Sequence, residues 1–478
     1  MKSNEENALT SFRSDPSSVF AWLKDGIIFK GLTFLQGFLL ISLLTRILSP
    51  HDFGIYTLIV SASYYVYIIS TLNLRSGMGP FVIHLKRDSE FLRKFWLAHG
   101  ASLVLMAAIT PILWLLEARF HLLNLNGSLL ILVVVSAFGY LLSDFATFPF
   151  QIYQKLKFYY MLNVVKGYSF LILSAIFLYF AHSQRVAILI CLSLLSSLII
   201  YKIAISQLLK IEDPSFKFDA HFLAKATLFS GGVFAIYLLS TSVPLIPRLF
   251  LSSHLDFSTL GLFSASLYFS VPLIFLKELI NSFWWSYFAR LSEKDRAFSA
   301  IVGIRYALTC SLGVVLLIKL SLPLLIHIVG KDYRGIENAV AILLIGHSFL
   351  VIHGIVESFY TAEAKTKHVI SAWLLSVATL LSVIYGGSRL EVRPLHFLSL
   401  SVTAAYAMQF FALAFLLTAT NKAKGIYAAF LKPFLPFLAA MAVLVLCPFS
   451  LILQTSAVAS FVAFVLIFKV VDLNEVRG

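Results

Sequence analysis

The stretch TRILSPHDFGIY, residues 45–56, lies between two long apolar runs and sets the pattern for the whole chain. Arg46 closes the first run, Pro50 stops its helix, and Gly54 opens the next run. A similar stretch, PRLFLSSHLDFSTLGLF, recurs at residues 247–263. Both stretches run Arg, Ser, His, Asp-Phe and then Gly before an aliphatic and an aromatic residue. Either a short motif repeats by chance, or the chain contains two related helical bundles, as many transporters do.

The composition is typical of a membrane protein. The chain is 59% hydrophobic and only 13% charged, whereas soluble domains carry about 25% charged residues. Its three cysteines all lie in apolar runs, without the spacing of a disulfide framework or a metal site. The net charge of +14 falls mainly in short loops, which fits the positive-inside rule better than a nucleic-acid partner. Residues 1–26 are mostly polar and do not resemble a cleavable signal peptide.

The apolar runs predict an all-α polytopic membrane protein with about fourteen helices, since each span needs about 20 residues. The predicted spans are 27–48, 53–72, 95–116, 128–150, 159–181, 186–208, 222–250, 258–288, 298–321, 336–360, 368–387, 394–418, 427–446 and 449–470. The loops between them are short, so we expect no inserted soluble domain.

Polar linkers and the repeated motif divide the spans into two lobes of six helices. We expect an N-terminal tail at 1–26, an N-lobe at 27–208, a linker at 209–221, a C-lobe at 222–420, and two further helices with a tail at 421–478. If the N-terminus is cytoplasmic, most loop lysines and arginines fall on the inside. Lys331 and Arg334 are the main exceptions. Both termini are therefore expected in the cytoplasm, with the chain in the inner membrane.

Several loop motifs resemble the bacterial polysaccharide flippases of the O-antigen (Wzx) type. These motifs are RILSPHDFGIY, LRSGMGPFVIHLKR, HIVGKDYRG and TAEAKTKH, and together they extend over nearly the whole chain. This family belongs to the multidrug/oligosaccharidyl-lipid/polysaccharide exporter superfamily. The resemblance implies two six-helix lobes around a central cavity, alternating access, and an oligosaccharide on an undecaprenyl pyrophosphate carrier as the cargo. It implies no cofactor, and a polysaccharide polymerase is a further candidate partner beside the lipid bilayer.

Charged residues inside the predicted spans mark the candidate site, because such charges are expensive in a bilayer and usually functional. Cations outnumber acids, which suits a pyrophosphate that must cross an apolar medium. The candidate substrate-binding residues are Lys277, Arg248, Arg46, Lys30, Lys166, Arg305 and Asn281. The candidate coupling or ion-pair acids are Asp144, Glu278 and Glu357.

Several of the polar residues inside the spans have a simpler structural interpretation. Lys30 lies near a helix end and can snorkel to the headgroups. Arg46 and Arg248 can be cations that the helix dipole favours at a C-terminal end. His347 and His353 can be interior histidines whose hydrogen bonds are satisfied.

Three classes of function fit these observations to different degrees. A flippase for a lipid-linked oligosaccharide fits the cationic excess best, and it performs no bond chemistry. A multidrug or organic-cation exporter of the same superfamily would need a site that prefers cations. A polytopic glycosyltransferase or polymerase would need an acidic residue or a large loop at its catalytic face, and the external loops here are short.

Overall fold

The computed structural model describes residues 16–74, 88–121, 123–152, 155–181, 183–209, 219–288, 293–363, 365–390 and 392–420. These residues form α-helices and one short 3-10 helix, so the all-α prediction is confirmed. The helices are α2 (Pro16–Ile47), α3 (Pro50–Thr71), α5 (Asp88–Phe120), α6 (Gly127–Ile152), α7 (Leu156–Phe180), α8 (Arg185–Leu208), α9 (Ala220–His254), α10 (Phe257–Tyr268), α11 (Val271–Phe288), α12 (Glu293–Val329), η1 (Lys331–Tyr333), α13 (Glu337–Ala362), α14 (Thr366–Arg389) and α15 (Pro394–Thr420).

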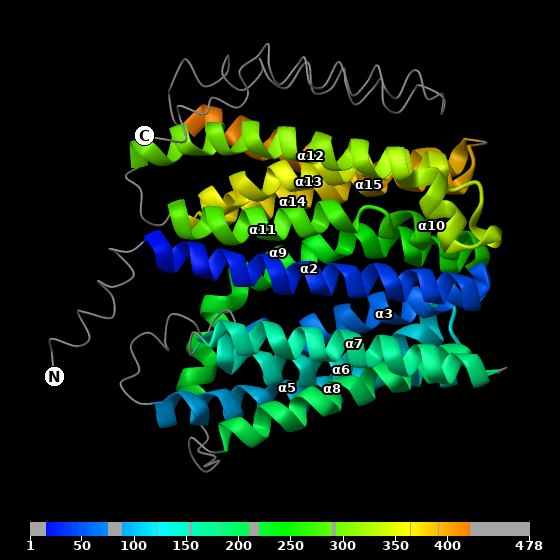
Figure 1. Cartoon of the computed structure of the whole chain (residues 1–478), viewed down its shortest axis with the longest axis horizontal. Coiled ribbons are helices and arrows are strands. Elements are labelled where there is room, and N and C mark those ends of the chain that lie inside the picture. Colours follow the sequence, from blue (N-terminus) through cyan, green and yellow to red (C-terminus); the bar gives the residue numbers. More distant parts are fainter. Residues whose placement is uncertain are drawn as a thin grey trace, which may run out of the picture.

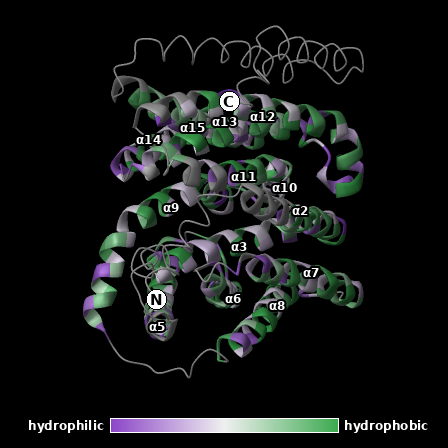
Figure 2. Ribbon diagram, turned by 60° about the vertical axis from the view of Figure 1, so that its left-hand side comes forward, coloured by the Kyte–Doolittle hydropathy of each residue, from purple (hydrophilic) through white to green (hydrophobic). Residues whose placement is uncertain are grey.

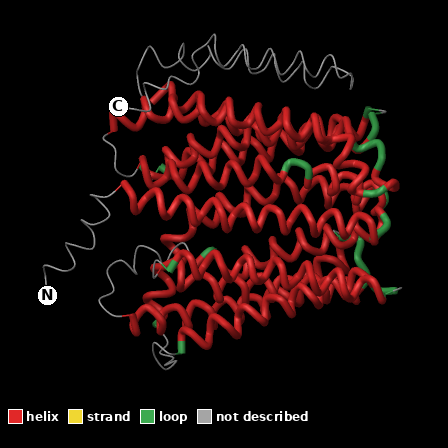
Figure 3. Tube along the Cα trace, in the orientation of Figure 1, coloured by secondary structure: helices red, strands yellow, loops and turns green. Residues whose placement is uncertain are grey.

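The helices lie nearly parallel in two groups (Figure 1). Helices α2, α3 and α5–α8 form the first group, in which α3 packs on α5 and α6, and α2 packs on α7. Helices α9–α15 form the second group, with α13 packed against α11, α12 and α15. Short connections make successive spans run in opposite directions (Figure 3). We call the end where α2 begins the N-terminal end of the bundle, and the other the opposite end.

The surface of the bundle is apolar along its sides, which Figure 2 shows as green bands on most helices. Leu115, Tyr179 and Leu228 are each at least 70% exposed there, as expected of side chains that face lipid. Within the described residues, eleven helices are long and apolar enough to span a membrane, and the pair α10–α11 makes a possible twelfth. The predicted spans 427–446 and 449–470 lie outside the described residues, so the total of about fourteen stays a prediction.

The predicted span 258–288 is not one straight helix. It forms α10 and α11, which are bent by 46° at their junction. Pro272 explains the break, because a proline lacks the N–H that would bond residue 268 and its ring clashes with that carbonyl. Tyr268 is accordingly the last residue of α10. The bend turns α11 onto α13 and so places the polar side chains of α11 inside the bundle.

The two groups meet at the opposite end through the two copies of the repeated motif. Helix α3 begins in the first copy and α10 in the second, and these two helices pack closely together. Thr57 donates a hydrogen bond to the Ser264 hydroxyl at 2.9 Å across this contact. His51 packs edge-on against the ring of Phe257, with centroids 5.5 Å apart. The motif is therefore one of the places where the two groups of helices touch.

Candidate functional site

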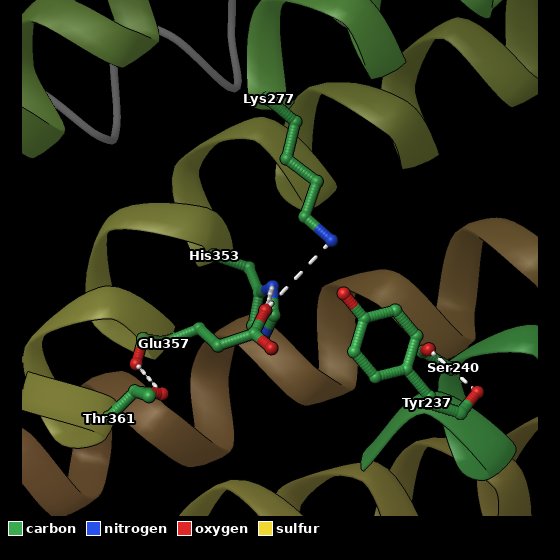
Figure 4. A network of polar contacts seen from close by, with 6 residues as sticks. All are labelled: Tyr237, Ser240, Lys277, His353, Glu357 and Thr361. Atoms are coloured by element: carbon green, nitrogen blue, oxygen red, sulfur yellow. Dashed lines mark hydrogen bonds and ion pairs between the residues drawn. The ribbon is translucent and has the colours of Figure 1, made fainter. Parts of the chain in front are cut away.

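A buried charged cluster lies between α11 and α13 (Figure 4). The Lys277 ammonium lies 3.9 Å from the Glu357 carboxylate, and their side chains are 20% and 18% exposed. One helical turn from Glu357, the Nδ1 atom of His353 lies 3.4 Å from the same carboxylate oxygen. Tyr237 of α9 points its hydroxyl toward these charges in the same view. An acid, a histidine and a lysine therefore meet where α11 packs on α13.

A second ion pair joins the two groups of helices. The Lys30 ammonium on α2 lies 4.0 Å from the Glu278 carboxylate on α11, next to Lys277 in the sequence. The Glu278 side chain is 62% exposed although it lies within a spanning segment. A carboxylate exposed there must face water rather than lipid, because a charge in hydrocarbon is expensive. Glu278 therefore marks a water-accessible space beside the charged cluster.

Close packing fixes α11 on α13 at this point. A β-carbon on Gly354 would collide with the Asn281 side-chain oxygen and would lie 3.2 Å from Cγ of Lys277. The Asn281 oxygen is buried and accepts no hydrogen bond from any residue that the structure describes. Glycine at 354 thus lets the two candidate residues Lys277 and Asn281 pack directly against α13.

The two histidines on α13, for which the sequence predicted the same role, lie in different surroundings. His347 contacts the carbonyl oxygen of Leu343 through Nδ1 at 2.8 Å, as expected of a satisfied interior histidine. His353 is fully buried, and apart from the charge contact of Nδ1 with Glu357 its ring nitrogens have no hydrogen-bond partner among the described residues. The i,i+4 spacing of His353 and Glu357 was the signal in the sequence that links this histidine to the charged cluster.

Lys166 and Asp144 lie apart from that cluster, in the first group of helices. The Lys166 ammonium on α7 lies 5.5 Å from the ring centroid of Tyr140 on α6. Asp144, one turn after Tyr140, lies within electrostatic range of Lys166. The candidate cations therefore do not lie in one place: Lys30 and Lys277 lie at the first cluster, and Lys166 lies by itself in the first group of helices.

Arg248 is buried within α9 and is not a helix-end cation. It is 9% exposed and lies six residues before the end of α9 at His254. Its guanidinium donates hydrogen bonds to the Ser264 hydroxyl at 3.3 Å and to the Pro244 carbonyl at 3.2 Å. No carboxylate among the described residues lies within ion-pair distance of it. Arg248 is thus a buried cation beside the contact between α3 and α10.

The remaining two candidate cations, Arg46 and Arg305, lie apart from the residues described above. Arg46 is exposed at the opposite end, where it donates to the Ile328 carbonyl at 2.7 Å and ties α2 to the end of α12. This contact is consistent with a structural role. Arg305 is half-buried on α12 and makes no hydrogen bond or ion pair through its side chain with any described residue.

An apolar cavity of about 410 Å³ lies next to the two ion pairs, between α2, the α10–α11 junction and α12. Phe34, one turn after Lys30, lines it from α2, and Pro272, five residues before Lys277, lines it from α11. Leu317 of α12 lines it from the side of the bundle and is 68% exposed. The cavity therefore reaches a lipid-facing surface and has none of the charged residues in its lining.

Long apolar spans with charged residues meeting between two helix groups define a multi-pass membrane protein with a transporter fold. The lipid II flippase MurJ, in an inward closed conformation, matches with a TM-score of 0.71 at 13% identity, covering 92% of this chain and 98% of MurJ. An inward-facing multidrug resistance MATE transporter of the MOP superfamily matches with a TM-score of 0.65 at 12% identity, covering 86% and 95%. An outward-facing MATE transporter matches with a TM-score of 0.55 at 12% identity, covering 87% and 94%. At these identities the likeness shows the fold.

The sequence family is narrower than the fold. A family model described as a polysaccharide biosynthesis protein matches residues 43–321, which is more than half of the chain. The chain belongs to this family. No curated protein sequence matches it. The predicted fold class and the resemblance to polysaccharide flippases are thereby confirmed.

Proposed function

We propose that this protein is an inner-membrane flippase that moves an oligosaccharide linked to undecaprenyl pyrophosphate from the cytoplasmic to the outer leaflet. Two lysines carry the proposal: Lys30 of α2 pairs with Glu278 of α11, and Lys277, the residue before Glu278, pairs with Glu357 of α13. A pyrophosphate needs cations wherever it crosses a medium of low polarity. Membership of the polysaccharide biosynthesis family supports a glycan cargo.

The apolar cavity supports a lipid-linked cargo rather than a free sugar. It is lined by Phe34, one turn from Lys30, and by Pro272, five residues before Lys277, and it reaches the exposed side of α12. An isoprenoid chain can lie there and remain in the bilayer while the pyrophosphate binds Lys30 and Lys277. Because lipid tails are as apolar as these walls, what the chain gains against the phenylalanines of α2 is packing and not removal from water.

In the structure both lysines are neutralised by acids, so an incoming pyrophosphate has to compete with Glu278 and Glu357. We infer that the cargo separates these ion pairs, and that the two groups of helices then move relative to each other. Because Lys30 lies in the first group and Lys277 in the second, one pyrophosphate held by both would couple cargo binding to that motion. Alternating access follows from this coupling, with both termini in the cytoplasm.

Substitution of Lys277 tests the proposal. Lys277→Ala should abolish surface polysaccharide and leave lipid-linked repeats in the cytoplasmic leaflet, while Lys277→Arg should keep part of the activity because the charge remains. Lys202→Ala is the matched control, since Lys202 is an exposed lysine within the span of α8. Normal surface polysaccharide in Lys277→Ala cells, at matched expression, would remove Lys277 from the site.

A multidrug exporter of organic cations is the second candidate, on the basis of the likeness in fold to MATE transporters. A cell lacking the protein separates the two functions. Loss of surface polysaccharide supports the flippase, whereas unchanged polysaccharide with new sensitivity to cationic drugs supports the exporter.

A further inference from the structure

Three tyrosine rings form a cluster in the first group of helices. Tyr64 and Tyr67 lie one turn apart on α3, with ring centroids 5.7 Å from each other. Tyr140 of α6 lies 5.4 Å from the Tyr64 ring and 6.1 Å from the Tyr67 ring. The cluster offers both aromatic faces and phenolic hydroxyls from two neighbouring helices.

Charged groups complete this cluster. Lys166 approaches the Tyr140 ring from α7 at 5.5 Å, a distance typical of a cation–π contact. Asp144 lies one turn beyond Tyr140 on α6, within electrostatic range of Lys166. The surface formed by Tyr64, Tyr67, Tyr140, Asp144 and Lys166, here called the tyrosine platform, can therefore both donate and accept hydrogen bonds.

The tyrosine platform is partly exposed, although Tyr67 also packs against the hydrophobic core. All of its five side chains are half-buried, although each lies within a spanning segment. A lysine and an aspartate directed at hydrocarbon would be expensive, so such groups face protein or a water-filled space. Their partial exposure indicates that water, or a ligand, reaches the platform.

The platform lies at about the same depth as the lysine that we assign to the pyrophosphate. Lys166 is ten residues into α7 from the N-terminal end of the bundle, which corresponds to about 15 Å. Lys277 is eleven residues from the end of α11 on that same side, or about 16 Å. A pyrophosphate held at Lys277 would therefore present the sugars attached to it at the level of the platform.

We propose that the tyrosine platform is a saccharide-binding site for the pyranose rings next to the pyrophosphate. This inference rests on the proposed flippase function. Aromatic faces suit the C–H surface of a pyranose, and the phenols, Asp144 and Lys166 suit its hydroxyls. An aromatic site with an acid also suits an organic cation, but here Lys166 already covers the Tyr140 ring and would repel one.

A comparison of two lipids tests the platform. The purified protein in lipid nanodiscs is titrated with undecaprenyl pyrophosphate, and separately with the lipid-linked oligosaccharide extracted from cells that make the protein. Tyr140→Ala should weaken binding of the glycosylated lipid about tenfold and leave binding of undecaprenyl pyrophosphate unchanged. Tyr140→Phe should keep most of the affinity because the ring remains. The control is Tyr179→Ala, since Tyr179 is 79% exposed on the lipid-facing side of α7.

The outcomes separate the platform from the flippase function. Unchanged binding of undecaprenyl pyrophosphate by Tyr140→Ala shows that the variant is folded and that only the sugar contact is lost. Equal weakening for both lipids, or no weakening for either, would overturn the platform while leaving the flippase intact. If the wild-type protein binds neither lipid, the proposed function fails and the platform fails with it.

Discussion

The carbonyl oxygen of Phe257 in α10 occupies the place that a β-carbon on Gly54 of α3 would need. The relationship is reciprocal, because the carbonyl oxygen of Pro50 in α3 lies where a β-carbon on Gly261 of α10 would need to be. In each helix the carbonyl belongs to the first residue and the glycine follows four residues later. The repeated motif thus builds one contact from two equivalent halves, with backbone against backbone.

We expect a larger residue at either glycine to separate α3 from α10. Gly54→Val should lower the free energy of unfolding by about 2 kcal/mol, the usual effect of overpacking, and should weaken closure of the opposite end. Thermal unfolding in detergent and accessibility of the opposite end to a thiol probe measure the two effects. Gly386→Val is the matched control, because a β-carbon there has open space. Equal stability of the two variants would contradict the prediction.

A cross-link across this contact should arrest transport. The hydroxyls of Thr57 and Ser264 lie 2.9 Å apart, so Thr57→Cys with Ser264→Cys should form a disulfide on oxidation. In a protein otherwise free of cysteine, oxidation should abolish transport of lipid-linked oligosaccharide into vesicles, and a reductant should restore it. Thr57→Cys alone should respond to neither treatment. Full transport by the cross-linked protein would show that this end does not open.

Removal of the acid that pairs with Lys277 should strengthen anion binding. Glu357→Gln leaves Lys277 without its carboxylate, so affinity for undecaprenyl pyrophosphate should rise about tenfold while turnover falls because release becomes slow. Titration in nanodiscs and a transport assay measure the two quantities. Glu278→Gln should have a smaller effect, since that carboxylate is 62% exposed and its interaction is screened by water. Weaker binding of undecaprenyl pyrophosphate by Glu357→Gln would show that Glu357 does not compete with the pyrophosphate for Lys277.

Thiol labelling tests the orientation in the membrane. Ser183 is exposed in the connection between α7 and α8 at the opposite end, and Lys367 is exposed near the start of α14 at the N-terminal end. With cytoplasmic termini, Ser183→Cys should react with an impermeant reagent in intact cells, and Lys367→Cys should react only after lysis. The reverse pattern would invert the topology.

The sequence predicted the spans better than their shapes. Hydropathy locates each described helix, since apolar length alone decides whether a segment can span a bilayer. The break before α11 was missed because Pro272 lies in a run whose composition remains apolar on both sides. The repeated motif in the sequence contains Gly54 and Gly261 at equivalent places, but only the tertiary structure shows that these two glycines lie against each other.

The candidate site was predicted as a set of charges, without its pairing. Arg46 and Arg248 hold equivalent places in the repeated motif, yet one is exposed and the other is buried. Lys30 had the sequence features of a snorkelling lysine, and its pairing with Glu278 depends on how α2 and α11 pack. The ring cluster of Tyr64 and Tyr140 is equally non-local. Pairing of this kind is decided by helix packing, which hydropathy does not encode.

The apolar cavity beside α2 and α12 bears on which cargoes the protein can tell apart. Its lining is formed almost entirely by aliphatic and aromatic side chains such as Phe34 and Leu317. Such walls select ligands by size and shape, because they have few hydrogen-bonding groups with which to recognise anything else. In the proposed flippase, this cavity would accept lipid carriers that differ in saturation but have a similar volume. In the proposed flippase, discrimination between glycans would then fall to the polar side chains of the charged cluster and the tyrosine platform, and the apolar cavity would play no part in it.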